Sequence, residues 1–190
     1  MLDRVSLERL TYFGGRAVAR TPPMNAEQLK ARQAPIKAHY REDPLSAQVT
    51  MHATGTLGTN SVTCNVTTPA GVIEAGLHPK AGGEEQWACS GDMLLQSLVA
   101  CAGVTLKAVA TALEIPLRGG KIFAEGDMDF RGTLGVSKET PIGFQHIRLR
   151  FELDSDATPE QKQKLLSLTE RFCVIYQTLK SPATITSEIA

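Results

Sequence analysis

The longest apolar stretch of the chain runs from residue 90 to residue 115, and it carries no charge over residues 93–106. A helix that is apolar on all sides belongs inside a fold rather than on its surface. Ser90 can cap the start of such a helix, and Pro116 cannot continue it. The pattern therefore predicts a buried central helix with Cys101 at its middle.

A membrane-spanning helix is the alternative interpretation of this stretch, since about 20 apolar residues are enough to cross a bilayer. The stretch is interrupted by polar or flexible residues, namely Gln96, Ser97, Gly103, Thr105 and Lys107. Strongly amphipathic strands also follow it, as in a fold that is not embedded in lipid. The core helix is therefore the preferred interpretation.

Two long strands after the central helix show the clearest alternation of apolar and polar residues. The first carries on its apolar side Ile122, Ala124, Gly126, Met128 and Phe130. In the second, polar residues such as His146 alternate with Ile147, Leu149, Phe151 and Leu153. A period of two is typical of half-buried antiparallel strands, and it puts His146 on the solvent side.

The rest of the chain divides into shorter elements at glycine, proline and asparagine residues. Asn25 begins a surface helix within residues 24–43, and Pro35 is expected to interrupt it. Short strands are predicted over residues 47–54, 60–67 and 71–75, and a last strand over residues 183–189.

A second helix begins with unusual clarity at Thr158-Pro159-Glu160-Gln161, which is a capping box with proline at the first helical position. Its apolar stripe follows at helical spacing and consists of Leu165, Leu168, Phe172, Ile175, Tyr176 and Leu179. Cys173 lies beside that stripe, so we expect the helix to run past it.

This order of elements predicts an α+β fold, with an antiparallel sheet wrapped around the long central helix and the second helix. Residues 24–190 are expected to form a single domain, preceded by a flexible polar tail over residues 1–23. Helices on one face of a sheet would leave one side of the central helix uncovered. We therefore expect a homodimer in which a second copy covers it.

The charge balance and the cysteines limit the classes of function. Twenty basic residues balance twenty acidic ones, which gives no footprint for nucleic acid or an anionic membrane. The four cysteines form no CxxC pair, and the glycine-rich loop after residue 75 lacks a phosphate-binding spacing, so we expect no metal and no cofactor. The N-terminus lacks a secretory signal, which suggests a cytoplasmic protein with reduced thiols.

The reactivity of Cys101 depends on its surroundings, because only a thiolate attacks a peroxide and burial raises the pKa of a thiol unless a cation or hydrogen-bond donor is near. Asp92 lies nine residues earlier, about 13 Å away on the opposite side of the helix. The nearest cations in the sequence before the helix are His78 and Lys80. The alternative is that Cys101 and Cys173 are inert core residues.

Two segments together resemble the osmotically inducible protein C (OsmC) and organic hydroperoxide resistance family of thiol peroxidases, over about residues 45–190. SGDMLLQSLVAC resembles the family's buried cysteine helix, and ERFCVIYQTLKSPATITSEI resembles its later helix with a second cysteine and a terminal strand. Val174 stands where many members have proline. The arginine that the family's peroxidases place upstream of the first cysteine has no counterpart beyond His78 and Lys80.

The resemblance implies an OsmC-like fold, an intertwined dimer and a peroxidase of organic or fatty-acyl hydroperoxides that serves oxidative-stress defence. Cys101 would react, Cys173 would resolve its sulfenic acid with later reduction by a dithiol, and Asp92 would support the site. His78, Lys80 and the apolar Leu98 are candidates for binding the substrate. The alternative is a protein of the same fold that binds a small apolar or thiol-bearing ligand without turnover. Cys64 and Cys89 are expected to be packing residues.

Overall fold

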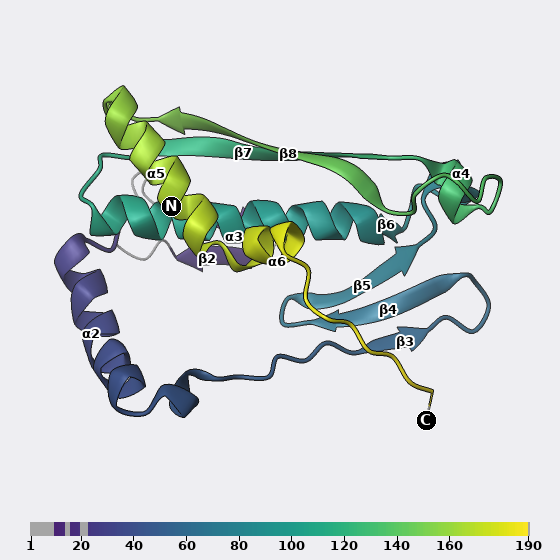
Figure 1. Cartoon of the computed structure of the whole chain (residues 1–190), viewed down its shortest axis with the longest axis horizontal. Helices are drawn as coiled ribbons and strands as arrows, with labels where there is room; N and C mark the ends of the chain where they lie inside the picture. Colours follow the sequence, from purple (N-terminus) through teal and green to yellow (C-terminus); the bar gives the residue numbers. More distant parts are fainter. Residues whose placement is uncertain (1–9, 14–15, 20–22, 190) are drawn as a thin grey trace, which may run out of the picture.

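The central helix α3 organises the molecule (Figure 1). The computed structural model describes residues 10–13, 16–19 and 23–189. The fold is α+β, as predicted. Its elements are β1 (Leu10–Phe13), β2 (Arg16–Ala19), α2 (Ala26–Glu42), η1 (Pro44–Ala47), β3 (Gly55–Leu57), β4 (Thr63–Thr68), β5 (Gly71–Gly76), η2 (Pro79–Ala81), β6 (Ala88–Cys89), α3 (Ser90–Ala112), β7 (Gly119–Met128), α4 (Phe130–Thr133), β8 (Phe144–Asp154), α5 (Pro159–Phe172) and α6 (Val174–Lys180).

The described strands form three separate sheets around α3. The long hairpin of β7 and β8 lies along one side of the helix, and the sheet β3-β4-β5-β6 lies near its N-terminal end (Figure 1). Pairing is antiparallel except between β5 and β6, which are parallel. In the hairpin Ile122 pairs with Phe151 and Ala124 with Leu149. The apolar residues predicted from the alternation therefore lie on the same face of both strands.

Helix α3 begins and ends differently from the prediction. Its N-cap is Cys89 rather than Ser90, because Cys89 is still extended in β6, and no side chain caps the helix. The helix stops at Ala112 instead of residue 115, since Glu114 takes the left-handed conformation with a φ of 54°. The backbone N–H of Ile115 then donates to the Ala110 carbonyl at 2.9 Å, which satisfies one of the open carbonyls of the last turn.

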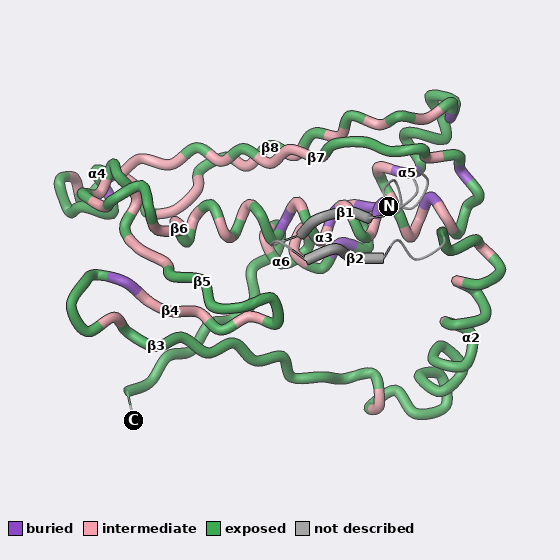
Figure 2. Tube along the Cα trace, turned by 180° about the vertical axis from the view of Figure 1, so that it is seen from behind, coloured by how far each residue is buried: buried purple, intermediate pink, exposed green. Residues whose placement is uncertain are grey.

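One side of α3 makes the core, and the other side is open. Leu98, Ala102, Leu106 and Ala110 are buried at the four-residue spacing that aligns side chains along a helix (Figure 2). Val104 on the opposite side is 73% exposed. The predicted uncovered side of the central helix is therefore present in the single chain. By length and composition α3 could also cross a bilayer, a test that the core helix of a folded domain passes as well.

Several predicted strands differ from the structure because a strand needs a partner. Residues 48–54 are irregular, and the sheet begins only at Gly55. The predicted strand 60–67 starts later, at Thr63, because residues 58–62 form a turn that the Gly58 N–H closes on the Thr63 carbonyl at 2.9 Å. The predicted last strand 183–189 is not formed, and Ile185 is 89% exposed. Strand β5 agrees with its prediction to within one residue.

Two further corrections concern local conformation. Phe130, predicted to close the apolar side of the first long strand, lies instead in the short helix α4, where Asp129 caps the turn. Pro35 does not interrupt α2, which continues from Ala26 to Glu42. This helix has no buried residue, so water can satisfy the carbonyl that proline leaves without a donor.

The predicted flexible tail, residues 1–23, lies largely outside the described residues. Two short strands within it, β1 and β2, pair as an antiparallel hairpin. The domain boundary at residue 24 stays a prediction. The capping residue Asn25 is confirmed, because its side chain accepts from the Gln28 backbone at 2.8 Å and the Gln28 side chain accepts from the Asn25 backbone at 3.1 Å.

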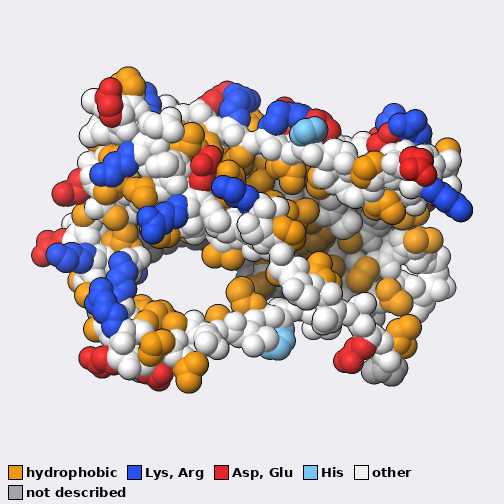
Figure 3. Space-filling model, viewed as in Figure 1, with side chains coloured by type: hydrophobic (Ala, Val, Ile, Leu, Met, Phe, Trp, Pro, Cys, Tyr) orange, Lys and Arg blue, Asp and Glu red, His pale blue; other side chains and the backbone are white. Residues whose placement is uncertain are grey.

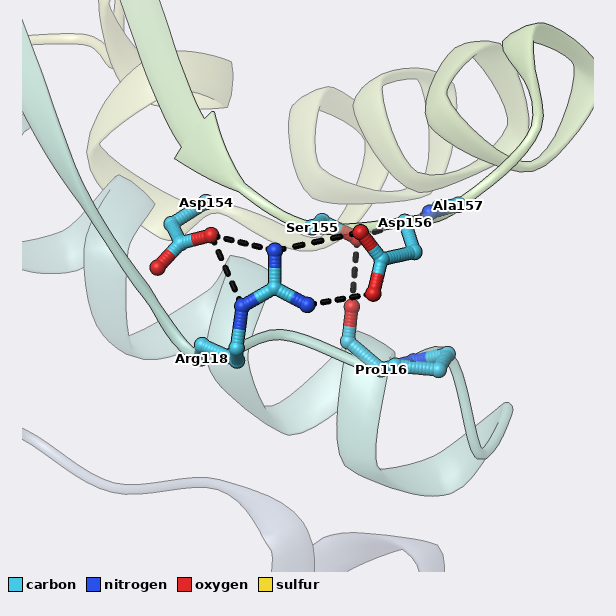
Figure 4. A network of polar contacts seen from close by, with 6 residues as sticks. All are labelled: Pro116, Arg118, Asp154, Ser155, Asp156 and Ala157. Carbon is cyan, nitrogen blue, oxygen red and sulfur yellow. Dashed lines mark hydrogen bonds and ion pairs between the residues drawn. The ribbon is translucent and has the colours of Figure 1, made fainter.

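An ion-pair network fastens the end of the hairpin to the segment that precedes α5 (Figure 4). The guanidinium of Arg118 donates to Asp154 at 2.8 Å and forms a two-pronged contact with Asp156. Its backbone N–H donates to the Asp154 carbonyl at 2.9 Å, and the Ser155 hydroxyl donates to the Pro116 carbonyl. These contacts hold the C-terminal end of α3 and the start of α5 in one place.

The cap of α5 allows a test of the fold. Thr158→Ala removes the acceptor of the Gln161 N–H, a bond of 3.2 Å, and should lower the free energy of unfolding by about 1 kcal/mol. Chemical denaturation monitored by circular dichroism measures this change. Thr178→Ala, at an exposed position of α6, is the matched control and should stay within about 0.5 kcal/mol of the parent protein. Equal losses in both variants would contradict the capping role.

Candidate functional site

The structure brings Cys101 and Cys173 together. Cys101 lies at the middle of α3, and Cys173 lies between α5 and α6. Both belong to one apolar cluster around Leu98 and Ala102, and each thiol shifts the pKa of the other. Cys173 is 1% exposed, Cys101 is half-buried, and both are free thiols.

A break in the predicted second helix positions Cys173. The residue has a ψ of 110° and serves as both the C-cap of α5 and the N-cap of α6, so the expected single helix is two helices. Its N–H donates to the Thr169 carbonyl at 2.9 Å, and its carbonyl accepts from the Gln177 N–H at 3.0 Å. The Gln177 side chain also donates to the Glu170 carbonyl at 2.7 Å, which satisfies an acceptor that the break leaves open.

The start of α6 points hydrogen-bond donors at Cys101. Burial opposes ionisation of this thiol, but the Ile175 backbone, the Cys173 thiol, the Val174 backbone and the Thr105 side chain all hydrogen-bond to it and together lower its pKa. Hydrogen bonds to a charged form favour that form. The donors are backbone and neutral groups of the same chain, and none of the groups that shift this pKa is a cation.

The pKa of Cys173 moves the opposite way. Burial raises it, and so do the hydrogen bond and the negative charge of Cys101, against the lowering effect of backbone donors at Tyr176 and Ile175. Two thiols in contact do not ionise independently. The arrangement therefore favours a Cys101 thiolate that accepts a hydrogen bond from a protonated Cys173.

Three of the other predicted site residues, Asp92, His78 and Lys80, lie outside the cluster that holds the two thiols. The His78 ring accepts from the Lys80 N–H at 3.0 Å and stacks on Phe130 at 4.8 Å between centroids. Asp92 lies in the first turn of α3, where it borders a shallow hollow of about 390 Å³ with Leu95, Gln96, Val99, Ala100 and Ala124. Asp92, His78 and Lys80 contribute nothing to the pKa of Cys101 within this chain. Their roles stay predictions.

Leu98 is the candidate for substrate binding that the structure places in the cluster of the two thiols. Its side chain is 2% exposed and packs against Cys173. It also borders a cavity of about 400 Å³ between β8 and α6, together with Phe144, Gln145, Ile147, Leu149, Glu170, Tyr176, Leu179 and Lys180. Apolar and charged side chains lie side by side on this part of the surface (Figure 3).

Cys64 and Cys89 lie on strands β4 and β6, outside the cluster that holds the other two thiols. Both are half-buried free thiols. Within residues 10–13, 16–19 and 23–189, no group of three or more His, Cys, Asp or Glu side chains is arranged to hold a metal ion.

Val174, Ile175 and Thr105 are the functional candidates that the sequence pattern did not reveal. Val174 is the first residue of α6, the position that favours proline because its N–H has no acceptor within the helix. The two β-branched residues after Cys173 were the only local signal of a new helix start, and it is weak.

The family model of OsmC-like proteins matches residues 83–188, which is more than half of the chain. The chain belongs to the OsmC-like protein family. The matched region includes the central helix α3 and the helices α5 and α6. No curated protein matches the sequence.

Solved structures agree on the OsmC-like fold at low sequence identity. An OsmC-like protein from Mycoplasma pneumoniae is 18% identical with a TM-score of 0.60, over 71% of this chain and 90% of that one. An organic hydroperoxide resistance protein OsmC from Legionella pneumophila is 14% identical with a TM-score of 0.54, over 70% and 93%. A hydroperoxide resistance protein from Vibrio cholerae, solved with captopril in one of its active sites, is 14% identical with a TM-score of 0.51, over 72% and 89%.

Val174 in this OsmC-like chain allows a test of the donors at Cys101. Val174→Pro removes the N–H at a position that tolerates the fixed φ of proline, so the pKa of Cys101 should rise. Loss of one hydrogen bond to a charged group predicts alkylation at neutral pH that is about tenfold slower. The measurement is the rate of iodoacetamide modification of Cys101 against pH, read by peptide mass spectrometry.

Val174→Ala is the control, because it removes the exposed side chain and keeps the N–H. Its pH profile should overlay that of the parent protein. A Val174→Pro profile that also overlays the parent would show that the N–H does not support the thiolate.

Proposed function

We propose that this OsmC-like protein is a thiol-dependent peroxidase that reduces organic hydroperoxides through Cys101 and Cys173. The single observation that carries the proposal is the contact between a thiol whose pKa is lowered and a second thiol whose pKa is raised. A two-step thiol peroxidase needs these two properties, since one sulfur must attack as thiolate and the other must wait as a thiol. The relatives named for organic hydroperoxide resistance agree with this class.

The first step is attack of the Cys101 thiolate on the outer peroxide oxygen. The O–O bond breaks, Cys101 becomes a sulfenic acid, and the organic alkoxide takes a proton to leave as an alcohol. The N–H groups of Val174 and Ile175 stabilise the thiolate before attack. Because they are part of the backbone, they need no reorganisation when the charge moves.

The second step joins the two sulfurs. The Cys173 thiol loses its proton, attacks the Cys101 sulfenic acid and releases water, so that a disulfide forms. A dithiol reductant then exchanges with this disulfide, becomes oxidised itself and restores both thiols. The packing of both cysteines in one cluster supports this step, because disulfide formation needs closely placed cysteines.

A homodimer is part of the proposal. Val104 and Leu94 of α3 are 73% and 38% exposed, and the sheet β3-β4-β5 carries Val72, which is 67% exposed. A second copy would cover these apolar side chains, whose burial contributes about 25 cal/mol per Å². The small-molecule partners and the chemistry of reduced thiols are consistent with a cytoplasmic location, which we propose as well.

Removal of each cysteine should separate the steps. Cys101→Ser should abolish the consumption of cumene hydroperoxide in stopped-flow measurements, because no thiolate attacks the peroxide. Cys173→Ser should allow a single oxidation of Cys101 without turnover, since the sulfenic acid is not resolved. After one equivalent of peroxide, peptide mapping of the parent protein should give a disulfide between Cys101 and Cys173.

Cys64→Ser and Cys89→Ser are the matched controls, and each should keep the rate within about threefold. A loss as deep as that of Cys101→Ser in either control would show that the wrong pair had been chosen. Equal peroxide consumption by Cys101→Ser and the parent, or none by either, would reject the peroxidase. The protein would then be an OsmC-like binding protein without turnover.

The dimer is tested by mass and by melting. Sedimentation at micromolar concentration should give twice the mass of the chain, and the melting temperature should rise with protein concentration because dissociation is coupled to unfolding. Val104→Glu should weaken the dimer, whereas the same charge in place of exposed Thr178 should not. A monomeric mass with a concentration-independent melt would count against the proposal.

A further inference from the structure

The cavity between β8 and α6 shares a wall with the two thiols. Five of the residues that border its volume of about 400 Å³ also pack in the cluster of Cys101 and Cys173, namely Leu98, Ile147, Leu149, Tyr176 and Leu179. The thiols themselves do not border the cavity. These five side chains therefore border both a hollow of ligand size and the cluster that contains the two thiols.

Tyr176 differs from the other four members of this wall. It is the only one with a polar group, and it belongs to α6, a helix of seven residues that starts directly after Cys173. Burial raises the pKa of its hydroxyl, and the negative charge of Glu170, which also borders the cavity, raises it further. The phenol is thus kept neutral beside a carboxylate, in a wall that is otherwise aliphatic.

Tyr176 is half-buried in the cluster, and its helix α6 packs there through Ile175, Tyr176 and Leu179. None of the residues of α6 is fully buried. By contrast, Leu98 is fixed at the centre of α3 with 2% of its surface exposed. Tyr176 is therefore the less buried of these two wall residues.

We propose that Tyr176 is a specificity-determining residue, whose ring closes the passage from this cavity to Cys101, and that the cavity holds the organic group of a bulky apolar hydroperoxide. This inference rests on the proposed peroxidase function. Hydrogen peroxide has no organic group and gains nothing from the cavity. The ratio of the two peroxide rates therefore reports on the wall rather than on the reactivity of the thiolate.

The test compares single-turnover oxidation of Cys101 by cumene hydroperoxide and by hydrogen peroxide in the parent protein, Tyr176→Phe and Tyr176→Ala. Opening the wall in Tyr176→Ala should raise the cumene to hydrogen peroxide rate ratio by about tenfold, in the range that pocket shape contributes to specificity. Tyr176→Phe keeps the ring and should change the ratio by less than about threefold. Tyr176→Leu replaces the alanine variant if the latter does not give a native circular dichroism spectrum.

Leu166→Ala is the matched control, because Leu166 borders the neighbouring cavity of about 510 Å³ but does not pack against the thiols. Its ratio should equal that of the parent. An unchanged ratio in Tyr176→Ala, with Cys101 still oxidised, would overturn the role of Tyr176 and leave the peroxidase proposal intact.

If the parent protein reacts with neither peroxide, the peroxidase proposal is rejected. The role of Tyr176 is then tested by alkylation of Cys101. Modification of Cys101 by bulky N-(1-pyrenyl)maleimide is then compared with modification by small iodoacetamide. A rate of modification by the bulky reagent that rises selectively by about tenfold in Tyr176→Ala would support the role of Tyr176 in closing the passage. Equal gains for both reagents, or none, would overturn it.

Discussion

The contact between Cys101 and the start of α6 is the constraint on which the site depends. A thiolate is costly in an apolar cluster unless donors replace the water that it loses. Here the donors come from a helix that begins one residue after the second cysteine, so the break at Cys173 places both the second thiol and the N–H groups of Val174 and Ile175. A continuous helix through Cys173 would have used those N–H groups in its own backbone bonds.

The rest of the fold keeps this contact in register. The buried side of α3 packs against β7, β8, α5 and α6, with one cluster around Cys173 and another around Leu106 and Leu165. The capping box at Thr158 and the ion pairs of Arg118 fix where α5 starts, and its 14 residues then determine where Cys173 meets α3. The position of the second thiol is therefore set by a helix start that is far from it in the chain.

The sequence predicted the elements that carry strong patterns. It failed where a pairing strand or a local break in a helix determines the structure. Periodicity identified α3, β7, β8 and the start of α5, because each carries a long apolar pattern or a specific cap. It did not predict the two helices α5 and α6, since Cys173-Val174-Ile175 contains neither glycine nor proline. The strand predicted over residues 183–189 has the right alternation but no pairing strand, and alternation alone does not supply one. The two predicted cysteines lie in one cluster, and the backbone groups that lower the pKa of Cys101 belong to a helix start that the sequence pattern did not show.

Backbone donors give the site a different pH behaviour from a cationic one. A histidine that supports a thiolate loses its effect above its own pKa, but an N–H group does not titrate in the range where proteins are folded. The lower limit of reactivity is therefore set by the lowered pKa of Cys101. The upper pH limit is set by Cys173, because deprotonation of this thiol removes a donor from Cys101 and adds a second negative charge beside it. The raised pKa of Cys173 moves that limit upward, so the coupling that lowers the pKa of Cys101 also widens the pH range between the two limits.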